Sequence, residues 1–450
     1  MNRRNFISTL GLASVAAAAG SRVFASETKP HFKVGVVGCG WYGGRVMAAL
    51  GRTGRVEIIS LCDVNQESLR TTSAALAKWQ QEKPRVFEDF REMLRSTHHD
   101  IVIVATPNHW HALPAIAAMQ AGADVHLEKP ISHDVIEGEA LVAAARKYQR
   151  IVQVNTQRRS TPHFIEAREK FVRSGRLGKI GLVETYGYLA GRINEILPDA
   201  AAPAHLNYDF WTGPAPLLPF KAIKENRGWR QFTAYSNGLS GDVGVHMFDA
   251  ARWLLGLGWP ESIRATGGIY VDKVSSADIS DSQRAVYSYP DLDVSWEHRT
   301  WGASQIPTRH WSDQWGVRLV GKHGSLNLTL LGYEFTPADN APKEGYNLFS
   351  KTKNLENVVI DEKFDITEEA EDRHSLDFLH AIDTRTLPVA DIEQGHISTA
   401  CCMIGDIAAK LGRTLRYDPA TRTIRGDAEA TALLAEPYRA PWIRPDPAHV

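Results

Sequence analysis

Two polar side chains lie four positions apart in a run bordered by glycines, Gly241-Asp242-Val243-Gly244-Val245-His246. If the segment is helical, Asp242 and His246 fall on one face. An imidazole is the usual base for taking a proton from an alcohol near neutral pH. A lone histidine near the start of a helix is more often structural, but the nearby acid and glycines favour a catalytic His246.

A lysine at a strand end is the second candidate. The predicted strand 124–127 is followed by Glu128-Lys129-Pro130. A cis Lys129–Pro130 bond would direct the side chain into a cleft. The amino group could then hydrogen-bond to a substrate hydroxyl or exchange a proton with it. The alternative is a surface lysine in a turn.

A glycine-spaced turn near the N-terminus predicts a phosphate-binding site. Residues 33–37 form a short β-branched run, residues 44–50 favour a helix, and Gly38-Cys39-Gly40-Trp41-Tyr42-Gly43 lies between them. In such a turn the first glycine permits the tight bend, the second lets the backbone approach a pyrophosphate, and the third lets the helix pack on the strand. The helix N-terminus offers free N–H groups to the phosphates. We expect the whole turn to hold a dinucleotide.

An acid at the expected distance strengthens this prediction. Residues 58–62 read as a second strand, and Asp63 closes it. An acid about 20 residues after the last glycine can accept hydrogen bonds from an adenosine ribose. Asp63 would repel a 2′-phosphate, and the next residue is Val64 rather than an arginine. We therefore predict NAD rather than NADP. The alternative is a structural glycine turn in an unrelated α/β domain.

The remaining pattern predicts two domains and a C-terminal extension. Strand-like and helix-like runs alternate over residues 31–155, which predicts a doubly wound dinucleotide-binding domain. Residues 156–390 carry alternating runs typical of one open, mostly antiparallel sheet with helices, which predicts an α+β domain for substrate binding and oligomerisation. Residues 391–450 read as C-terminal helices and a tail. The predicted strands of the second domain are residues 181–189, 262–271, 285–289, 293–300, 316–320 and 325–330.

A long irregular segment, about residues 190–236, is rich in Pro, Trp and Asn. Loops of this length commonly shape a binding site. Its aromatic side chains could stack on a sugar ring or could fill the interface between sheet and domain. We place Trp211 and Trp229 among the candidate substrate residues, and Tyr208 and Tyr235 belong to the same group.

Composition excludes several function classes. The 450 residues are 43% hydrophobic and 23% charged, and the formal net charge is −1. This balance gives no electrostatic footprint for nucleic acid or an anionic membrane. The four cysteines, Cys39, Cys62, Cys401 and Cys402, have neither disulfide nor zinc spacing, and no metal site is predicted.

The N-terminus resembles a twin-arginine export signal. Arg3-Arg4 precedes a short apolar run, and small residues allow cleavage after Ala25. The run is too short to span a bilayer, so we expect residues 1–25 to be removed and the mature protein to be periplasmic or secreted, without membrane insertion. The alternative is a frayed cytosolic N-terminus. An exported dinucleotide enzyme would have to keep its cofactor bound, because no free nicotinamide pool is expected outside the inner membrane.

The four motifs together resemble one family. The glycine turn, Thr106-Pro-Asn-His-Trp-His111, Glu128-Lys129-Pro130 and Asp242-x-Gly244-x-His246 occur in the order and spacing of the glucose–fructose oxidoreductase / inositol dehydrogenase / rhizopine catabolism (Gfo/Idh/MocA) family. The resemblance implies that Lys129 and His246 flank the reacting secondary alcohol and that Asp242 helps to orient the substrate. It also implies that Asn108, His111 and Glu128 line the nicotinamide side and that Thr106 is among the cofactor-binding residues.

The same resemblance covers nearly all of the mature chain. Asn155-Thr-Gln157-Arg158 matches the strand end that enters the family's second domain, where Gln157 and Arg158 can reach cofactor or substrate. The leader and the tail from Pro437 to Trp442 resemble an exported subgroup. Secreted glucose–fructose oxidoreductase itself keeps NADP, and Asp63 departs from that member.

These observations leave two hypotheses. The first is an exported NAD-dependent oxidoreductase with tightly bound cofactor that acts on a secondary hydroxyl of a sugar, glycoside or cyclitol. The second is a redox-neutral glycoside hydrolase or lyase that oxidises the sugar transiently, cleaves it and reduces it back. A non-catalytic sugar-binding protein is disfavoured because Lys129, Asp242 and His246 are all present. An open sheet with an uncovered face also predicts a homo-oligomer.

Overall fold

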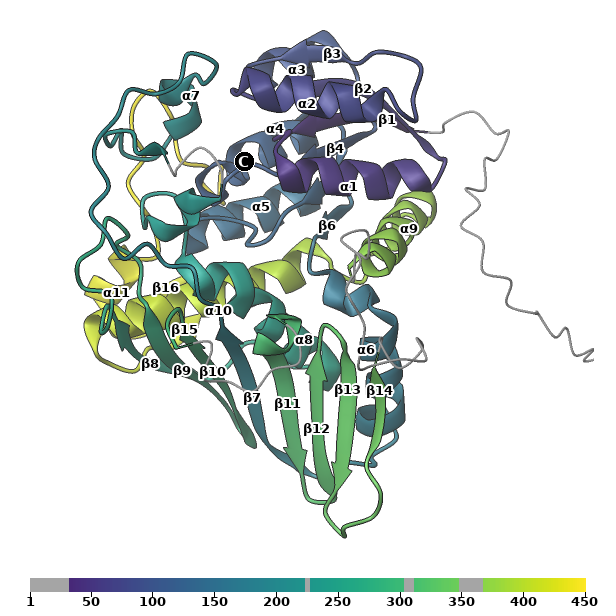
Figure 1. Cartoon of the computed structure of the whole chain (residues 1–450), viewed down its shortest axis with the longest axis vertical. Helices are drawn as coiled ribbons and strands as arrows, with labels where there is room; N and C mark the ends of the chain where they lie inside the picture. The colour runs from purple at the N-terminus through teal and green to yellow at the C-terminus, as the bar shows by residue number, and fades with distance from the viewer. Residues whose placement is uncertain (1–31, 223–226, 303–310, 348–366) are drawn as a thin grey trace, which may run out of the picture.

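The computed structural model describes residues 32–222, 227–302, 311–347 and 367–450. A parallel sheet covered by helices lies at the top of Figure 1, and a larger open sheet lies below it. The predicted fold class is therefore confirmed. The predicted export signal, residues 1–25, lies outside the described residues.

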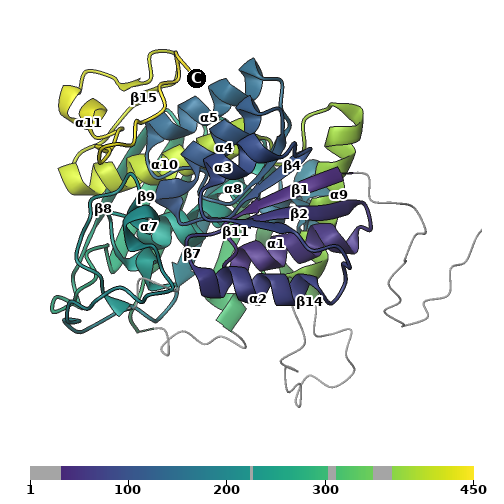
Figure 2. The same ribbon diagram turned by 90° about the horizontal axis from the view of Figure 1, so that it is seen from above.

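The N-terminal sheet has six parallel strands in the order β3-β2-β1-β4-β5-β6. The order reverses between β1 and β4, and ligands of open α/β sheets bind outside the carboxyl ends of the strands at such a point. Helices cover both faces, as Figure 2 shows, which is why β4 reads as a continuous apolar run. The strands are β1 Phe32–Val37, β2 Val56–Cys62, β3 Arg85–Phe87, β4 Ile101–Val104, β5 Asp124–Leu127 and β6 Val152–Val154.

Three of the five covering helices, α2, α3 and α5, begin at a side-chain cap, whereas α1 and α4 do not. The Asn65 side chain accepts hydrogen bonds at the start of α2, and Asp134 and Glu137 form a capping box at the start of α5. Helix α1, in contrast, has no side-chain cap at Gly40 and no acid in its first turn. Helix α2 ends at Leu76, although the sequence pattern extends to residue 81. The helices are α1 Trp41–Arg52, α2 Gln66–Leu76, α3 Phe90–Ser96, α4 Ala112–Gln120 and α5 Val135–Lys147.

The second sheet has eight strands in the order β14-β13-β12-β11-β7-β10-β9-β8. All neighbours are antiparallel except β7 and β10, which run parallel. The six predicted strands are present, and β13 and β14 extend the sheet beyond the prediction. The strands are β7 Ile180–Tyr188, β8 Ser262–Gly268, β9 Ser282–Tyr289, β10 Leu292–Arg299, β11 Trp315–Gly321, β12 Gly324–Thr329, β13 Gly332–Pro337 and β14 Glu344–Asn347.

Helices connect the two sheets. Helix α10 packs against α5 of the first domain and against β8 and α8 of the second, and α9 packs against α1. The C-terminal tail returns to the first domain, where Trp442 stacks on Phe210 and makes an edge contact with Trp110. The remaining α-helices and strands are α6 Pro162–Ala167, α7 Tyr208–Thr212, α8 Val245–Leu255, α9 Glu368–Thr384, α10 Ile392–Leu411, β15 Tyr417–Asp418, β16 Thr423–Ile424 and α11 Ala428–Ala432.

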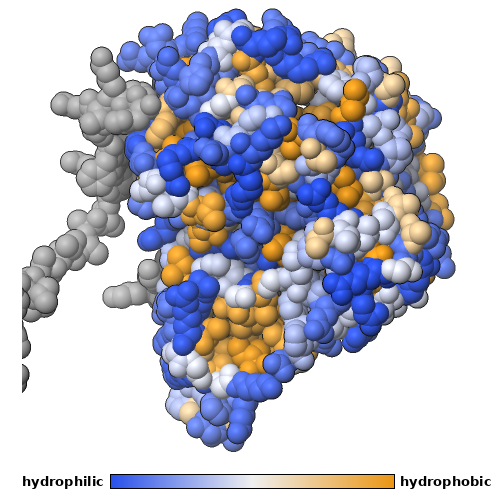
Figure 3. Space-filling view, turned by 180° about the vertical axis from the view of Figure 1, so that it is seen from behind, coloured by the Kyte–Doolittle hydropathy of each residue, from blue (hydrophilic) through white to orange (hydrophobic). Residues whose placement is uncertain are grey.

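The outward face of the large sheet carries charged side chains in cross-strand pairs. Arg318 lies 3.1 Å from Glu184, and Arg284 lies 2.9 Å from Glu297. Seen from behind, apolar residues also gather on the lower part of the molecule (Figure 3). No helix among the described residues is long and apolar enough to cross a membrane.

Candidate active site

A cavity of about 1200 Å³ lies where the strand ends of the first domain face the second domain. Most of the predicted site residues line it. Cys39, Gly43 and Asn155 do not. The predicted residues in the wall are Gly38, Gly40, Trp41, Tyr42, Asp63, Thr106, Asn108, His111, Glu128, Lys129, Gln157, Arg158, Trp211, Trp229, Asp242 and His246.

The glycine turn has the geometry that its spacing predicts. Gly38 has φ +92°, and a Cβ there would lie 2.6 Å from the backbone of Ala105. A Cβ on Gly43 would overlap the carbonyl oxygen of Gly38, so α1 packs directly on the turn. A Cβ on Gly40 would meet no atom within 4 Å. Gly40 therefore leaves open space at the uncapped N-terminus of α1.

We expect Gly43→Ala to affect stability and Gly40→Ala to affect cofactor binding. Gly43→Ala should destabilise the fold, because its methyl group meets backbone. Gly40→Ala should leave the melting temperature within about 2 °C and weaken NAD binding about tenfold or more, because its methyl group enters the space where the pyrophosphate is predicted. Thermal unfolding with and without added NAD measures both effects. Unchanged cofactor affinity in Gly40→Ala would remove the dinucleotide from this turn.

Asp63 lies at the end of β2, beside the turn. Its carboxylate accepts hydrogen bonds from the backbone N–H groups of Cys39 at 2.7 Å and Asn65 at 2.8 Å. Burial raises the pKa of Asp63 to about 6. The Cys39 side chain points into the core, so Cys39 contributes its N–H group rather than a contact with the cavity.

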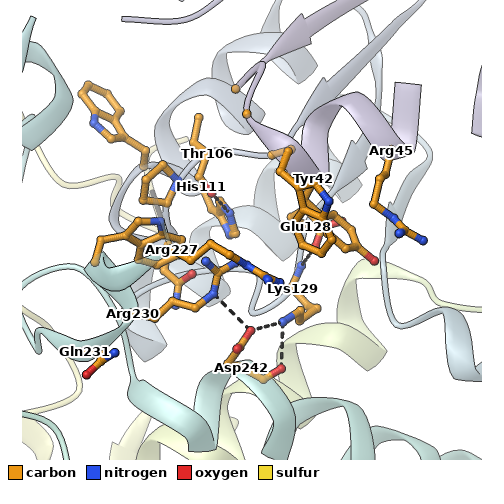
Figure 4. Close-up of a pocket in the computed structure, with 18 of the residues that line it drawn as sticks. Tyr42, Arg45, Thr106, His111, Glu128, Lys129, Arg227, Arg230, Gln231 and Asp242 are labelled. Carbon is orange, nitrogen blue, oxygen red and sulfur yellow. Dashed lines mark hydrogen bonds and ion pairs between the residues drawn. The ribbon is translucent and has the colours of Figure 1, made fainter. Parts of the chain in front are cut away.

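Lys129 and Asp242 are joined across the domain interface. The Lys129 Nζ donates to Asp242 Oδ1 at 2.7 Å and to the Asp242 carbonyl oxygen at 2.8 Å, and Arg230 Nε lies 3.4 Å from the same Oδ1 (Figure 4). These two cations hold the pKa of Asp242 far below its ordinary value. The Lys129–Pro130 bond is cis. The structure thus places Lys129 in the cavity wall rather than in a surface turn.

His246 is the second residue of helix α8 and lines the cavity. Burial and the positive charges of Lys129 and Arg158 lower its pKa well below the ordinary value, so the imidazole is neutral near pH 7. Neither ring nitrogen makes a hydrogen bond within the described residues, and Nδ1 is fully buried. The preceding turn, Ser240–Gly244, is π-helical. Asp242 and His246 both line the cavity, and the Asp242 carboxylate bonds to Lys129 rather than to the imidazole.

The strand ends of β4 and β5 bring the remaining candidates together. Each ring nitrogen of His111 faces a backbone carbonyl oxygen, of Pro130 at 2.6 Å and of Thr106 at 2.8 Å. Glu128 is buried, which raises its pKa to about 8, and it accepts a hydrogen bond from Asn155 at 2.5 Å. Asn155 therefore lies behind the wall and orients Glu128.

Two residues that hold the site in place could not be predicted from the sequence alone. Glu371 on α9 accepts hydrogen bonds from Tyr42 at 2.6 Å and from Gln157 at 2.9 Å, so a helix from the far end of the chain supports the glycine turn. Asp249 on α8 forms a two-pronged, fully buried ion pair with Arg159, with both nitrogens 2.8 Å from carboxylate oxygens. Because Asp249 is on the same helix as His246, this pair fixes where the imidazole lies.

The aromatic side chains of the long loop divide between the two predicted roles. Trp211 stacks on Tyr208 and makes an edge contact with Tyr235, so this cluster mainly fills the interface. Trp229 lies in the cavity wall with the Arg230 guanidinium 4.3 Å from its ring centre. The residues that flank it, Arg227 and Arg230, were missed, although Arg227-Gly-Trp-Arg230 was a recognisable basic and aromatic run.

Sequence profiles of one family match both domains. "Oxidoreductase family, NAD-binding Rossmann fold" matches residues 32–156, and "Oxidoreductase family, C-terminal alpha/beta domain" matches residues 184–292 and 347–444, both under the Gfo/Idh/MocA name. The chain belongs to this family of oxidoreductases. The predicted enzyme class and Rossmann domain are thereby confirmed.

Individual members are more distant. Inositol 2-dehydrogenase of Salmonella paratyphi B is 27% identical over 165 residues, which are 36% of this chain and 48% of that protein. A glycosyl hydrolase family 109 protein of Shewanella sp. strain ANA-3 is 31% identical over 122 residues, 26% of this chain and 27% of that protein. The chain therefore aligns with less than half the length of these curated relatives.

The structural likeness is more extensive. A structure of levoglucosan dehydrogenase in complex with NADH and levoglucosan has a TM-score of 0.64 and 18% sequence identity, covering 85% of this chain and 98% of that one. At this level of identity the likeness establishes a common fold.

Proposed function

We propose that this Gfo/Idh/MocA protein is an NAD-dependent oxidoreductase that acts on a secondary hydroxyl of a sugar, glycoside or cyclitol. The observation that carries the proposal is one cavity lined by the open glycine turn, the Lys129 ammonium group and the neutral His246 imidazole. Dehydrogenases of inositol and levoglucosan are among the similar proteins, which supports this substrate class.

The described residues fit a dinucleotide. The uncapped start of α1 and the open space at Gly40 suit a pyrophosphate, and Asp63 suits two ribose hydroxyls. Trp41, Tyr42 and Gln157 line the cavity beside the turn, and Thr106, Asn108, His111 and Glu128 line the part proposed for the nicotinamide. We propose NAD rather than NADP because the Asp63 carboxylate would repel a 2′-phosphate. When bound, NAD supplies a hydride acceptor.

The side chains of this chain supply the proton chemistry. His246, neutral near pH 7, accepts the hydroxyl proton of the substrate. Lys129 donates a hydrogen bond to the developing alkoxide, and the Asp242 carboxylate fixes its ammonium group at 2.7 Å. Asp242 thus acts by orienting Lys129, and the second cation on its carboxylate, Arg230, keeps it ionised.

We further propose twin-arginine export to the periplasm or outside the cell, with a cofactor that does not exchange. The support is the leader composition and the position of the cavity between two domains. Such an enzyme would oxidise one substrate and reduce another on the same bound cofactor. An N-terminus at Ser26 in protein purified from the periplasm would agree with export, and an intact Met1 in the cytosol would not.

A redox-neutral glycoside hydrolase or lyase is the second candidate function. The similarity to a glycosyl hydrolase family 109 protein favours it. In that reaction, oxidation of a sugar hydroxyl acidifies the hydrogen next to the new carbonyl, and the neighbouring glycosidic group leaves as an alcohol. In a hydrolase, water then adds to the resulting unsaturated ketone, and the carbonyl is reduced back.

One experiment separates these functions. The protein purified without added cofactor is denatured, and released nicotinamide is measured by absorbance; about one equivalent supports a retained cofactor. The native protein is then incubated with an aryl glycoside and, separately, with pairs of aldoses. Aldonate plus alditol supports the oxidoreductase, whereas aglycone release that is lost in His246→Ala supports the hydrolase. If neither kind of product forms, with or without added NAD, both functions are contradicted.

Association into a homo-oligomer through the open sheet is also a proposal. It is supported by the uncovered outward face of the sheet, although the cross-strand ion pairs make that face polar. Light scattering of the purified protein tests it, and a monomer mass at micromolar concentration would contradict it.

A further inference from the structure

Cations outnumber ionised carboxylates in the described wall of the cavity. Six cationic side chains line it, against four carboxyl groups. Asp63 and Glu88 lie beyond β2 and β3, at the proposed ribose end, and Glu128 is largely protonated near pH 7. Of these four, only Asp242 is left to balance the positive charge around Lys129. The cations are Arg45, Lys129, Arg158, Arg192, Arg227 and Arg230.

Arg158 is the most informative of these cations. It is 3% exposed, and its guanidinium group makes no hydrogen bond or ion pair within the described residues. Glu371 is the carboxyl group that acts most strongly on the charge of Arg158. Its Oε1 already accepts hydrogen bonds from Tyr42 and Gln157. Burying an unpaired charge is costly, and it commonly marks a site where the partner arrives with a ligand.

Arg158 lies beside the proposed base. Its guanidinium carbon lies 5.5 Å from the centre of the Trp315 ring, and the His246 ring lies 6.0 Å from the same ring. Arg158 and the proposed base therefore share one corner of the cavity. Arg227 stacks on Trp41, in the first turn of α1, at 4.0 Å, and Arg158 also interacts electrostatically with Tyr42 of that turn.

We propose that the substrate carries a carboxylate, as a uronic or aldonic acid does, and that Arg158 binds it while His246 and Lys129 face the reacting hydroxyl. The proposal rests on the proposed function and names its substrate class. The planar guanidinium fork matches the two oxygens of a carboxylate. The pair would form in a buried corner, where the unpaired arginine gains its counter-charge from the substrate.

Pairs of ligands that differ only in the carboxylate charge test this proposal. D-glucuronate and D-galacturonate are compared with their methyl esters, which keep the ring stereochemistry and lose the charge. Calorimetry on the NAD-loaded mature protein measures binding, and absorbance at 340 nm measures reduction of the bound cofactor. We expect at least one acid to bind about 10- to 100-fold more tightly than its ester, the range for a hydrogen-bonded charged pair. Equal binding of acid and ester in both pairs, or no binding of either acid, overturns the proposal.

Variants assign the preference to Arg158. Arg158→Gln should collapse the acid-to-ester ratio to near one, and Arg158→Lys should retain only part of it. Arg168→Gln removes a guanidinium that stacks on Trp253 outside the cavity wall, and it should keep the ratio. Because Arg158 makes no hydrogen bond or ion pair within the described residues, Arg158→Gln should melt at the same temperature as the parent or higher. A ratio that survives in a folded Arg158→Gln protein overturns the assignment.

Two further outcomes keep this proposal distinct from the proposed function. If the acids bind preferentially but no sugar reduces the cofactor, the carboxylate subsite stands and the oxidoreductase fails. If esters and acids reduce the cofactor with equal efficiency, the oxidoreductase stands and the carboxylate subsite fails. Glucose 6-phosphate and glucose 6-sulfate carry other anionic groups. If either binds more tightly than the uronates, the proposal that the substrate carries a carboxylate is overturned.

Discussion

Replacing Lys129 by methionine should lower kcat by about 10²- to 10⁴-fold, the range for a positioned acid–base group. The Lys129 Nζ is held 2.7 Å from Asp242 Oδ1 in the cavity wall, where the ammonium group can stabilise a developing alkoxide. Methionine has a similar length and no charge. Because the hydrogen bond to an alkoxide forms only as the reaction proceeds, the loss should fall on kcat more than on KM.

Steady-state kinetics on a sugar that the parent protein oxidises measures this effect. NAD affinity and melting temperature are measured on the same samples, since the variant also leaves Asp242 with Arg230 as its described cationic partner. Lys343→Met removes an exposed lysine that pairs with Glu334 and serves as the control. A folded Lys129→Met protein with kcat within threefold of the parent would show that Lys129 does not take part in the reaction.

Asp249→Ala should cost about 3–5 kcal/mol of unfolding free energy, the usual effect of breaking a buried ion pair from one side. Arg159 and Asp249 are 4% and 0% exposed in their side chains, and Ser398 also donates to Asp249 at 2.8 Å. Removing the carboxylate leaves the Arg159 guanidinium buried. Among the described residues, its remaining hydrogen-bond acceptor is then the backbone carbonyl of Val389. The pKa of Asp249 is lowered by Arg159, so its stabilisation is present above the ordinary pKa of aspartate and is lost as the pH falls through the lowered value.

Urea unfolding at pH 7 measures the loss. Glu334→Ala breaks an exposed ion pair in the same domain and should cost at most about 1 kcal/mol. The double variant Arg159→Met/Asp249→Leu should recover much of the stability, because it removes both charges together. A loss in Asp249→Ala no larger than that of the exposed control would mean that the pair does not hold α8 in place.

The first domain was largely predictable because its signals are local and chemically specific. The glycine turn needs a positive φ at Gly38 and a missing side chain at Gly43, and Asp63 is fixed by its distance from that turn. The buried strands and the helices between them follow from continuous and periodic apolar runs. Boundaries were less accurate, as in α2, because helix ends depend on contacts rather than on periodicity.

The second domain shows what a single sequence does not contain. Strands β13 and β14 are held by pairing with β12 and with each other, and their own residues alternate weakly. The turn Ser240–Gly244 is π-helical, and the Asp242 carboxylate within it bonds to a lysine 113 positions earlier. Glu371 and Asp249 act through partners far away in the sequence, so no local pattern marks them.

The proposed function requires a dinucleotide across the Gly38 turn with its nicotinamide toward Lys129 and His246. A crystal structure of the mature protein with NAD and a bound sugar tests it most directly. We predict ribose hydroxyls hydrogen-bonded to Asp63 and one substrate oxygen within hydrogen-bond reach of both Lys129 Nζ and a ring nitrogen of His246. A cofactor bound elsewhere, or a substrate oxygen that only one of the two side chains can reach, would contradict the proposed function.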